Sequence, residues 1–198
     1  DAPAIATHRE ASEKLHRVKD RAFDAIARRV RDSVATTEYD IQQLMAGWFR
    51  EEGLISDADP MVSVGPNAGN PHYLPTATVH RAIRRDDLVL LDLWGKLDAP
   101  GAVFADITWM GYTGRAVPER FGRAFTAIRD ARDAAVELVQ SSVRAGRELR
   151  GWEVDRAAMT VLRDAGYADN ILHRTGHSLG TTVHGNGANM DDYETHDD

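Results

Sequence analysis

Two stretches of this sequence decide its fold: Asp87-Leu-Val-Leu-Leu-Asp92-Leu-Trp94 and, after a loop, Val103-Phe-Ala-Asp106-Ile-Thr-Trp-Met110. Their apolar, branched and aromatic residues predict two β-strands, over 88–94 and 103–110, that pair as a hairpin. Each strand carries one aspartate, and a buried carboxylate costs free energy unless a cation or hydrogen-bond donors pair with it. Pairing of the strands would let Asp92 and Asp106 approach one point. The alternative is that one aspartate faces solvent and the other belongs to a turn.

Amphipathic helices flank this hairpin on both sides along the chain. Apolar residues recur at helical spacing from Leu15 to Val30, and Thr37 and Gly53 provide an N-cap and a C′ residue for a second helix. Pro118 at the first helical position begins a third helix, and a fourth ends at Gly166. The expected elements are helices over 6–33 and 38–52, a strand over 61–64, an irregular loop over 65–75, the hairpin, helices over 118–144 and 152–164, and a strand-like segment over 171–184.

An internal repeat relates the two pairs of helices. At an offset of 113 residues Tyr39 aligns with Trp152, and Gly53 with Gly166. Two amphipathic helices often match by chance, but the separation of 112 residues between His72 and His184 strengthens the alignment. We therefore predict one α+β domain over 1–198, made of two pseudo-symmetric helix–helix–strand halves, about 1–116 and 117–198. The counterparts of the two hairpin aspartates would fall near positions 205 and 219, so we expect the second half to be incomplete here.

Composition excludes several classes of protein. Hydrophobic residues make up 42% and charged residues 28% of the chain, which is typical of a folded globular protein. Asp92 interrupts the longest apolar run, whereas a membrane span needs about 20 apolar residues. The absence of cysteine excludes disulfides and thiolate metal sites. A net charge of −7 argues against binding to nucleic acid. With no signal peptide visible, we expect a cytoplasmic protein with neither membrane nor nucleic-acid partners.

Three histidines lie close together in His173-Arg-Thr-Gly-His177-Ser-Leu-Gly-Thr-Thr-Val-His184. Glycines between them suit a backbone that passes close to a ligand. Imidazole suits Zn, Mn, Fe or Co, so histidines together with aspartates indicate a hydrolytic transition-metal site. Two metal ions ~3.5–4 Å apart can activate a water, but three ligands are too few to hold them. The alternative is a polar loop with incidental histidines.

These blocks resemble the pita-bread metallopeptidases, the family of methionine aminopeptidase, Xaa-Pro aminopeptidase, prolidase and the metal-free creatinase. The resemblance includes the loop Gly65-Pro-Asn-Ala-Gly-Asn-Pro-His72-Tyr-Leu-Pro-Thr76 and covers nearly the whole chain in the family's order. It implies the pita-bread fold, and the Asn-Pro-His-Tyr loop is closest to the proline-directed members. Two departures are a longer spacing between the aspartates and Trp109 where many members have arginine.

The resemblance also implies roles for individual residues. The residues that match the metal ligands are Asp92, Asp106 and His177. His184 matches a catalytic histidine that contacts substrate and moves a proton, and His72 a catalytic and substrate-binding histidine on the opposite wall. His173 matches a histidine that either supports a metal ligand from behind or lies near the substrate carboxylate. The family's two remaining ligands are glutamates on later strands, which we expect to lie beyond Asp198.

The sequence therefore predicts a metal-dependent hydrolase, an Xaa-Pro aminopeptidase or dipeptidase that cleaves the amide bond before proline in a peptide or dipeptide. It would use two divalent metal ions, Mn, Zn, Co or Fe, and could act as a homodimer. Without the two glutamates we expect the 198-residue chain by itself to be inactive. Two alternatives stay open: a pita-bread module that has lost catalysis and binds peptides, and a creatinase-like hydrolase without metal.

Overall fold

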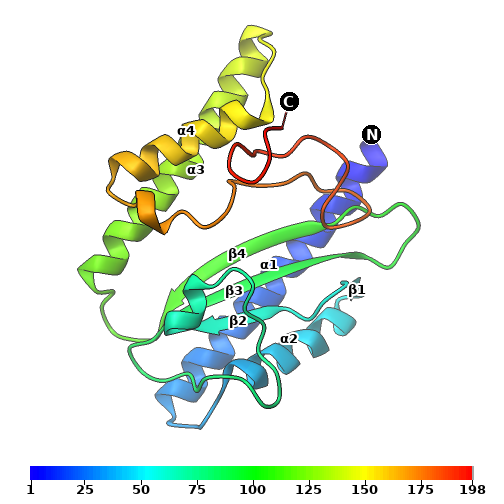
Figure 1. Ribbon diagram of the computed structural model, residues 1–198. Helices are drawn as coiled ribbons and strands as arrows, with labels where there is room; N and C mark the ends of the chain where they lie inside the picture. Colours follow the sequence, from blue (N-terminus) through cyan, green and yellow to red (C-terminus); the bar gives the residue numbers. More distant parts are fainter. Residues whose placement is uncertain (198) are drawn as a thin grey trace. The chain divides into compact units, whose positions relative to one another are not determined.

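The computed structural model describes residues 1–197 and divides into two compact units (Figure 1). The first unit comprises residues 1–116 with 180–183, and the second comprises 117–179 with the segment from His184 onward. Within the described range no helix is long and apolar enough to cross a bilayer.

Two helices form one layer of the first unit. α1, Ala2–Arg31, begins earlier than expected because the Asp1 side chain caps it, accepting a hydrogen bond from the Ala4 amide at 3.0 Å. α2, Glu38–Glu51, has the expected cap at Thr37, and Gly53 beyond its end takes a positive φ of 67°. Both helices bury one apolar face, which includes Leu15, Val18, Ile41 and Met45.

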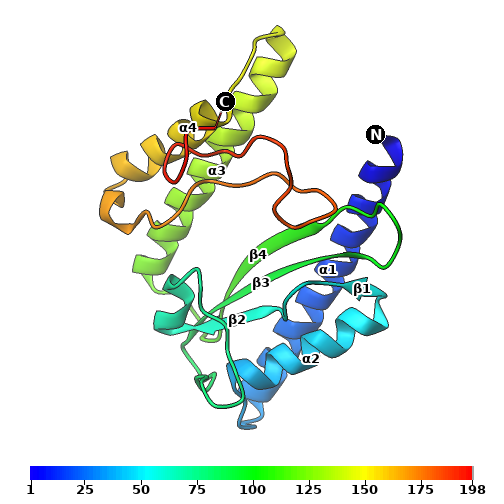
Figure 2. The same ribbon diagram turned by 45° about the vertical axis from the view of Figure 1, so that its right-hand side comes forward.

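Four antiparallel strands form the other layer (Figure 2). The central strand β3, Leu88–Leu97, pairs with β4, Ala105–Tyr112, on one side. On its other side it pairs in succession with β2, Met61–Val64, and β1, Leu54–Ile55. The hairpin of β3 and β4 confirms the expected pairing, and the short helix η1, Gly65–Gly69, begins the loop that was expected to be irregular.

Alternation along β3 decides which residues face the helices. Val89, Leu91 and Leu93 are buried in the core with α1 and α2. The residues between them, including Asp92, are half-buried and point to the opposite face. Gly111 of β4 lies on the helix side, where a β-carbon would come within 2.5 Å of the Phe23 ring. Glycine here permits the close approach of α1 to the sheet.

The second unit is built on two packed helices. α3, Glu119–Ala145, begins one residue later than expected, because Pro118 is its N-cap residue and not its first helical residue. α4, Gly151–Asp164, packs against α3 through small residues that include Ala131, Ala135 and Ala158. The short helix η2, Ala168–Asn170, follows α4.

The prediction of a strand-like segment over 171–184 is wrong. After η2 the chain forms bends and turns, and its one β-type contact in the described part is an isolated bridge between Gly176 and Met190. A strand needs a continuous row of partner hydrogen bonds, whereas the hydrogen bonds of this segment are scattered, some to side chains and some to isolated backbone groups. Two buried carboxylates, Asp155 and Asp191, hold its first part through Thr175 and Arg174.

Candidate functional site

Asp92 and Asp106 share one face of the β3–β4 hairpin. Asp92 pairs with Thr108 across the two strands, and Asp106 pairs with Trp94. Residues directly opposite each other, and residues two apart on one strand, point to the same face, so the two aspartates are diagonal neighbours. Such neighbours lie ~7–8 Å apart. Both are half-buried on the face turned away from α1 and α2.

Thr108 orients the carboxylate of Asp92. Its hydroxyl Oγ1 donates a 2.7 Å hydrogen bond to Asp92 Oδ1. Asp92 lies on the central strand of the sheet, where neighbouring strands on both sides restrict its backbone. One oxygen is therefore directed by a neighbour on the same face, and the hairpin presents two carboxylates side by side.

His177 and His184 come together in the second unit. Their ring centroids are 4.4 Å apart with an interplanar angle of 69°. The Gly185 amide donates to the Ser178 carbonyl at 2.8 Å, which closes the turn between the two histidines. His177 Nδ1 lies 3.1 Å from the Ser178 carbonyl, and a hydrogen bond there places the proton on Nδ1 and makes Nε2 the acceptor nitrogen. A neutral imidazole of this tautomer can bind a metal ion.

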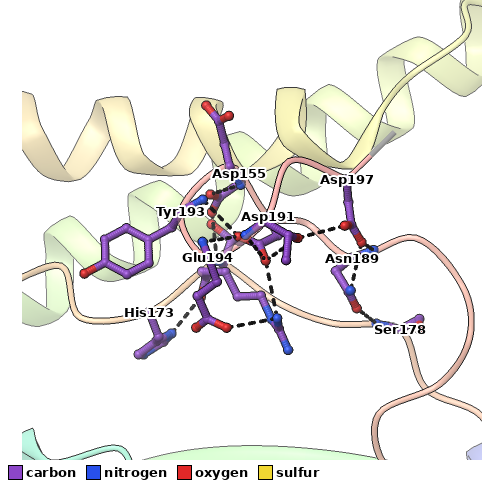
Figure 3. Close-up of polar contacts among 12 residues, drawn as sticks. Asp155, His173, Ser178, Asn189, Asp191, Tyr193, Glu194 and Asp197 are labelled. Carbon is purple, nitrogen blue, oxygen red and sulfur yellow. Dashed lines mark hydrogen bonds and ion pairs between the residues drawn. The ribbon is translucent and has the colours of Figure 1, made fainter.

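His173 has a similar local contact but is exposed. Its Nδ1 lies 2.6 Å from the Arg174 carbonyl. The next residues are held to α4 by Asp155, a fully buried side chain. Asp155 Oδ1 accepts a hydrogen bond from the Thr175 amide at 2.8 Å, and Oδ2 accepts one from the Asp192 amide at 2.7 Å (Figure 3). One carboxylate thus attaches both the histidine segment and the C-terminal segment to α4.

The Asp191 side chain is a second buried hydrogen-bond acceptor, close to Asp155 (Figure 3). Its carboxylate receives hydrogen bonds from the amides of Tyr193, Glu194 and Thr195 and from the Thr195 hydroxyl, and it pairs with Arg174 at 3.3 Å. Burial opposes ionisation of Asp191, but hydrogen bonds from the Glu194 and Tyr193 amides and from Thr195 outweigh it and lower the pKa. Asp191 therefore holds the turn that follows the histidine segment.

His72 lies in an exposed loop of the first unit. Its amide donates to Asn70 Oδ1 at 3.0 Å. The neighbouring Tyr73 is half-buried, and its hydroxyl donates to the carboxylate of Glu38 at the start of α2. Burial, and then the hydrogen bond to Glu38, raise the pKa of Tyr73.

The residues of the sheet unit fit part of a metal centre. The sheet presents two carboxylates on one face, and a hydroxyl orients one of them. Carboxylate oxygens are ligands that bind divalent cations. Among residues 1–197 no three His, Asp or Glu side chains gather closely enough to hold a metal ion. The hairpin thus presents a pair of carboxylates on one face of the sheet. Within the second unit, the contact of His177 Nδ1 with the Ser178 carbonyl defines a tautomer of the kind that binds metal ions.

Sequence reasoning missed Glu38, Asp155 and Asp191. Asp155 occupies the inward face of α4 beside Val154 and Met159. Its partner at the 113-residue offset is Gln42, which is also buried. The sequence did contain a signal for Asp155, because a polar residue occurs on the apolar face of both helices at the same position of the repeat.

Comparisons with known proteins agree on one family. Residues 9–197 match the sequence profile described as metallopeptidase family M24. A probable dipeptidase, PepE, of Mycobacterium tuberculosis is 30% identical over 165 residues, which are 82% of this chain and 41% of that protein. An Xaa-Pro dipeptidase of Lactobacillus helveticus is 28% identical over 163 residues, 82% of this chain and 39% of that protein.

A solved structure extends the match to the fold. Dipeptidase PepE from Mycobacterium ulcerans superposes with a TM-score of 0.75 and 26% identity, covering 95% of this chain and 46% of that one. The likeness confirms the expected pita-bread fold. The chain spans less than half the length of these three relatives.

Proposed function

From the premise that this chain belongs to metallopeptidase family M24, we propose that the protein is a metal-dependent exopeptidase that hydrolyses the amide bond before proline. The observation that carries the proposal is the pair Asp92 and Asp106 on one face of the β3–β4 hairpin. An Xaa-Pro dipeptidase among the relatives supports the substrate class, a peptide or dipeptide containing proline.

The proposed metal ligands in this chain are Asp92, Asp106 and His177. Two divalent ions, of Mn, Zn, Co or Fe, would supply a water of lowered pKa when bound. Thr108 keeps one oxygen of Asp92 in a set direction, since its hydroxyl donates to that oxygen. The Ser178 carbonyl has a similar effect on His177, because accepting a hydrogen bond from Nδ1 fixes the tautomer in which Nε2 carries the lone pair. Manganese is the ion we propose to test first.

The residues of this chain that we propose to contact the substrate are His184, His72 and His173. His184, whose ring packs against that of His177, would donate a proton or hydrogen bond near the scissile amide. His72 would donate to the carbonyl oxygen as negative charge develops on it, and His173 would bind the substrate carboxylate. We further propose a single catalytic domain, a cytoplasmic location and assembly as a homodimer.

Two other functions predict different chemistry. A creatinase-like hydrolase would act without metal and would have no need of paired carboxylates on the hairpin. A module that only binds peptides would keep the histidine segment but lose turnover. The pair of aspartates favours the metal-dependent peptidase over both.

The test compares Asp106→Asn with Asp98→Asn, an exposed loop aspartate, in the full-length protein. We expect wild type and Asp98→Asn to bind manganese by calorimetry and to release the residue before proline. Asp106→Asn should lose turnover with an unchanged circular dichroism spectrum. Full activity in Asp106→Asn would favour the creatinase-like mechanism. Peptide binding without turnover in the presence of Mn, Co or Zn would favour the binding module.

A further inference from the structure

Glu38 lies at the first position of α2, with no solvent exposure. Its side chain is held where the N-terminus of the helix favours negative charge. Thr37 immediately before it forms a capping box with Asp40, which fixes the start of the helix. The carboxylate is therefore placed by the backbone of α2.

In the described part of the chain, the groups that donate hydrogen bonds to the Glu38 carboxylate all come from one segment, residues 64–81, which we call the His72 loop. Oε1 accepts from the Val64 amide at 2.7 Å and from Asn67 Nδ2 at 2.9 Å. Oε2 accepts from the Tyr73 hydroxyl and from the Arg81 amide at 2.6 Å.

These four donors attach the His72 loop at both ends and next to His72. Val64 ends β2 and Arg81 closes the loop, and the Glu38 amide in turn donates to the Arg81 carbonyl at 2.9 Å. Tyr73 is the residue adjacent to His72. The other side-chain hydrogen bonds described within the loop are local, such as that from the Val79 amide to Thr76 Oγ1. Glu38 thus connects the loop to the helix layer at several points, and Tyr39 of α2 adds a stacked ring contact with His80.

We propose that Glu38 is a positioning residue for His72, setting the loop in which that histidine meets substrate. The proposal rests on the proposed function, since it assumes that His72 contacts substrate. Glu38 itself stays beneath the loop and acts through it. A buried acceptor with four donors leaves an unmet donor wherever one of its oxygens is replaced.

The first experiment needs no activity. In Glu38→Gln an amide group replaces one oxygen and faces donors, so exchange of the Val64 and Arg81 amides with deuterium should accelerate roughly tenfold or more. Glu51→Gln, on the exposed side of the same helix, is the control and should leave these rates unchanged. Unchanged exchange in Glu38→Gln would overturn the proposal.

The second experiment tests action through His72. In the full-length protein, Glu38→Gln and His72→Ala should each raise KM, and the double variant should be no worse than His72→Ala within about twofold. A merely structural role predicts that the two factors multiply, and multiplication would overturn the proposal. If wild type shows no peptidase activity, the proposed function fails, and the exchange rates alone decide whether Glu38 holds the loop.

Two less disruptive variants test the same proposal if Glu38→Gln does not fold. Tyr73→Phe and Asn67→Ala each remove one donor and keep the buried carboxylate. Each should accelerate exchange within the His72 loop and show the same lack of additivity with His72→Ala. Protection equal to wild type in both would overturn the proposal.

Discussion

Asp155 offers a quantitative test of how the histidine segment is held. Its side chain is fully buried and its two oxygens accept from the amides of Thr175 and Asp192 at 2.8 and 2.7 Å. Asp155→Asn has nearly the same shape, but its NH₂ group must face one of these two N–H donors. One charge-assisted hydrogen bond is lost, one buried donor is left without an acceptor, and the other bond becomes neutral.

The expected cost follows from these losses. A hydrogen bond to a charged group contributes ~1.5–3 kcal/mol, and an unmet buried donor costs ~1–3 kcal/mol. Relief from burying a charge offsets part of the sum. We therefore expect Asp155→Asn to lower the free energy of unfolding by ~2–4 kcal/mol, a large part of the ~5–15 kcal/mol typical of a folded protein.

Urea unfolding of the 198-residue chain measures this change, and hydrogen exchange locates it. Exchange should accelerate at the amides of Thr175 and Asp192 and stay unchanged in α1, which belongs to the other unit. Asp164→Asn, an exposed aspartate at the end of the same helix, is the control. A change below ~0.5 kcal/mol in Asp155→Asn, the range of ordinary surface substitutions, would refute the reasoning.

Two further predictions concern acid stability and helix packing. Because the pKa of Asp191 is lowered in the folded protein, its contribution is complete above the ordinary aspartate value of 3.8 and is lost as pH falls below it. Urea unfolding at pH 6 and pH 3 should therefore show a smaller acid-induced loss in Asp191→Asn than in wild type; equal losses would contradict this account. Gly111→Ala should destabilise the chain by ~1–2 kcal/mol, because its β-carbon meets the Phe23 ring. In thermal unfolding, the double variant with Phe23→Leu should regain part of the stability lost in Gly111→Ala. If it regains none, the contact with the Phe23 ring is not the cause of the loss.

Local patterns in the sequence were sufficient for most of the secondary structure. Apolar spacing at 3.6 residues located α1 to α4 to within a few residues, and strand propensity located β2, β3 and β4. The hairpin also placed Asp92 and Asp106 on one face, since register and alternation are local consequences of pairing. The pita-bread family followed from motifs that are contiguous in the chain.

The tertiary structure alone decided how the histidine loops are held. Glu38 accepts hydrogen bonds from residues 26 to 43 positions away, and Asp155 from residues 20 and 37 positions away. The segment over 171–184 has the composition of a strand, yet it is irregular because no neighbouring strand supplies its hydrogen bonds in the described part of the chain. Sequence periodicity reports which face of an element is apolar. Which distant N–H group reaches a buried carboxylate depends on how the elements pack, because the acceptor and its donors meet only in the folded unit.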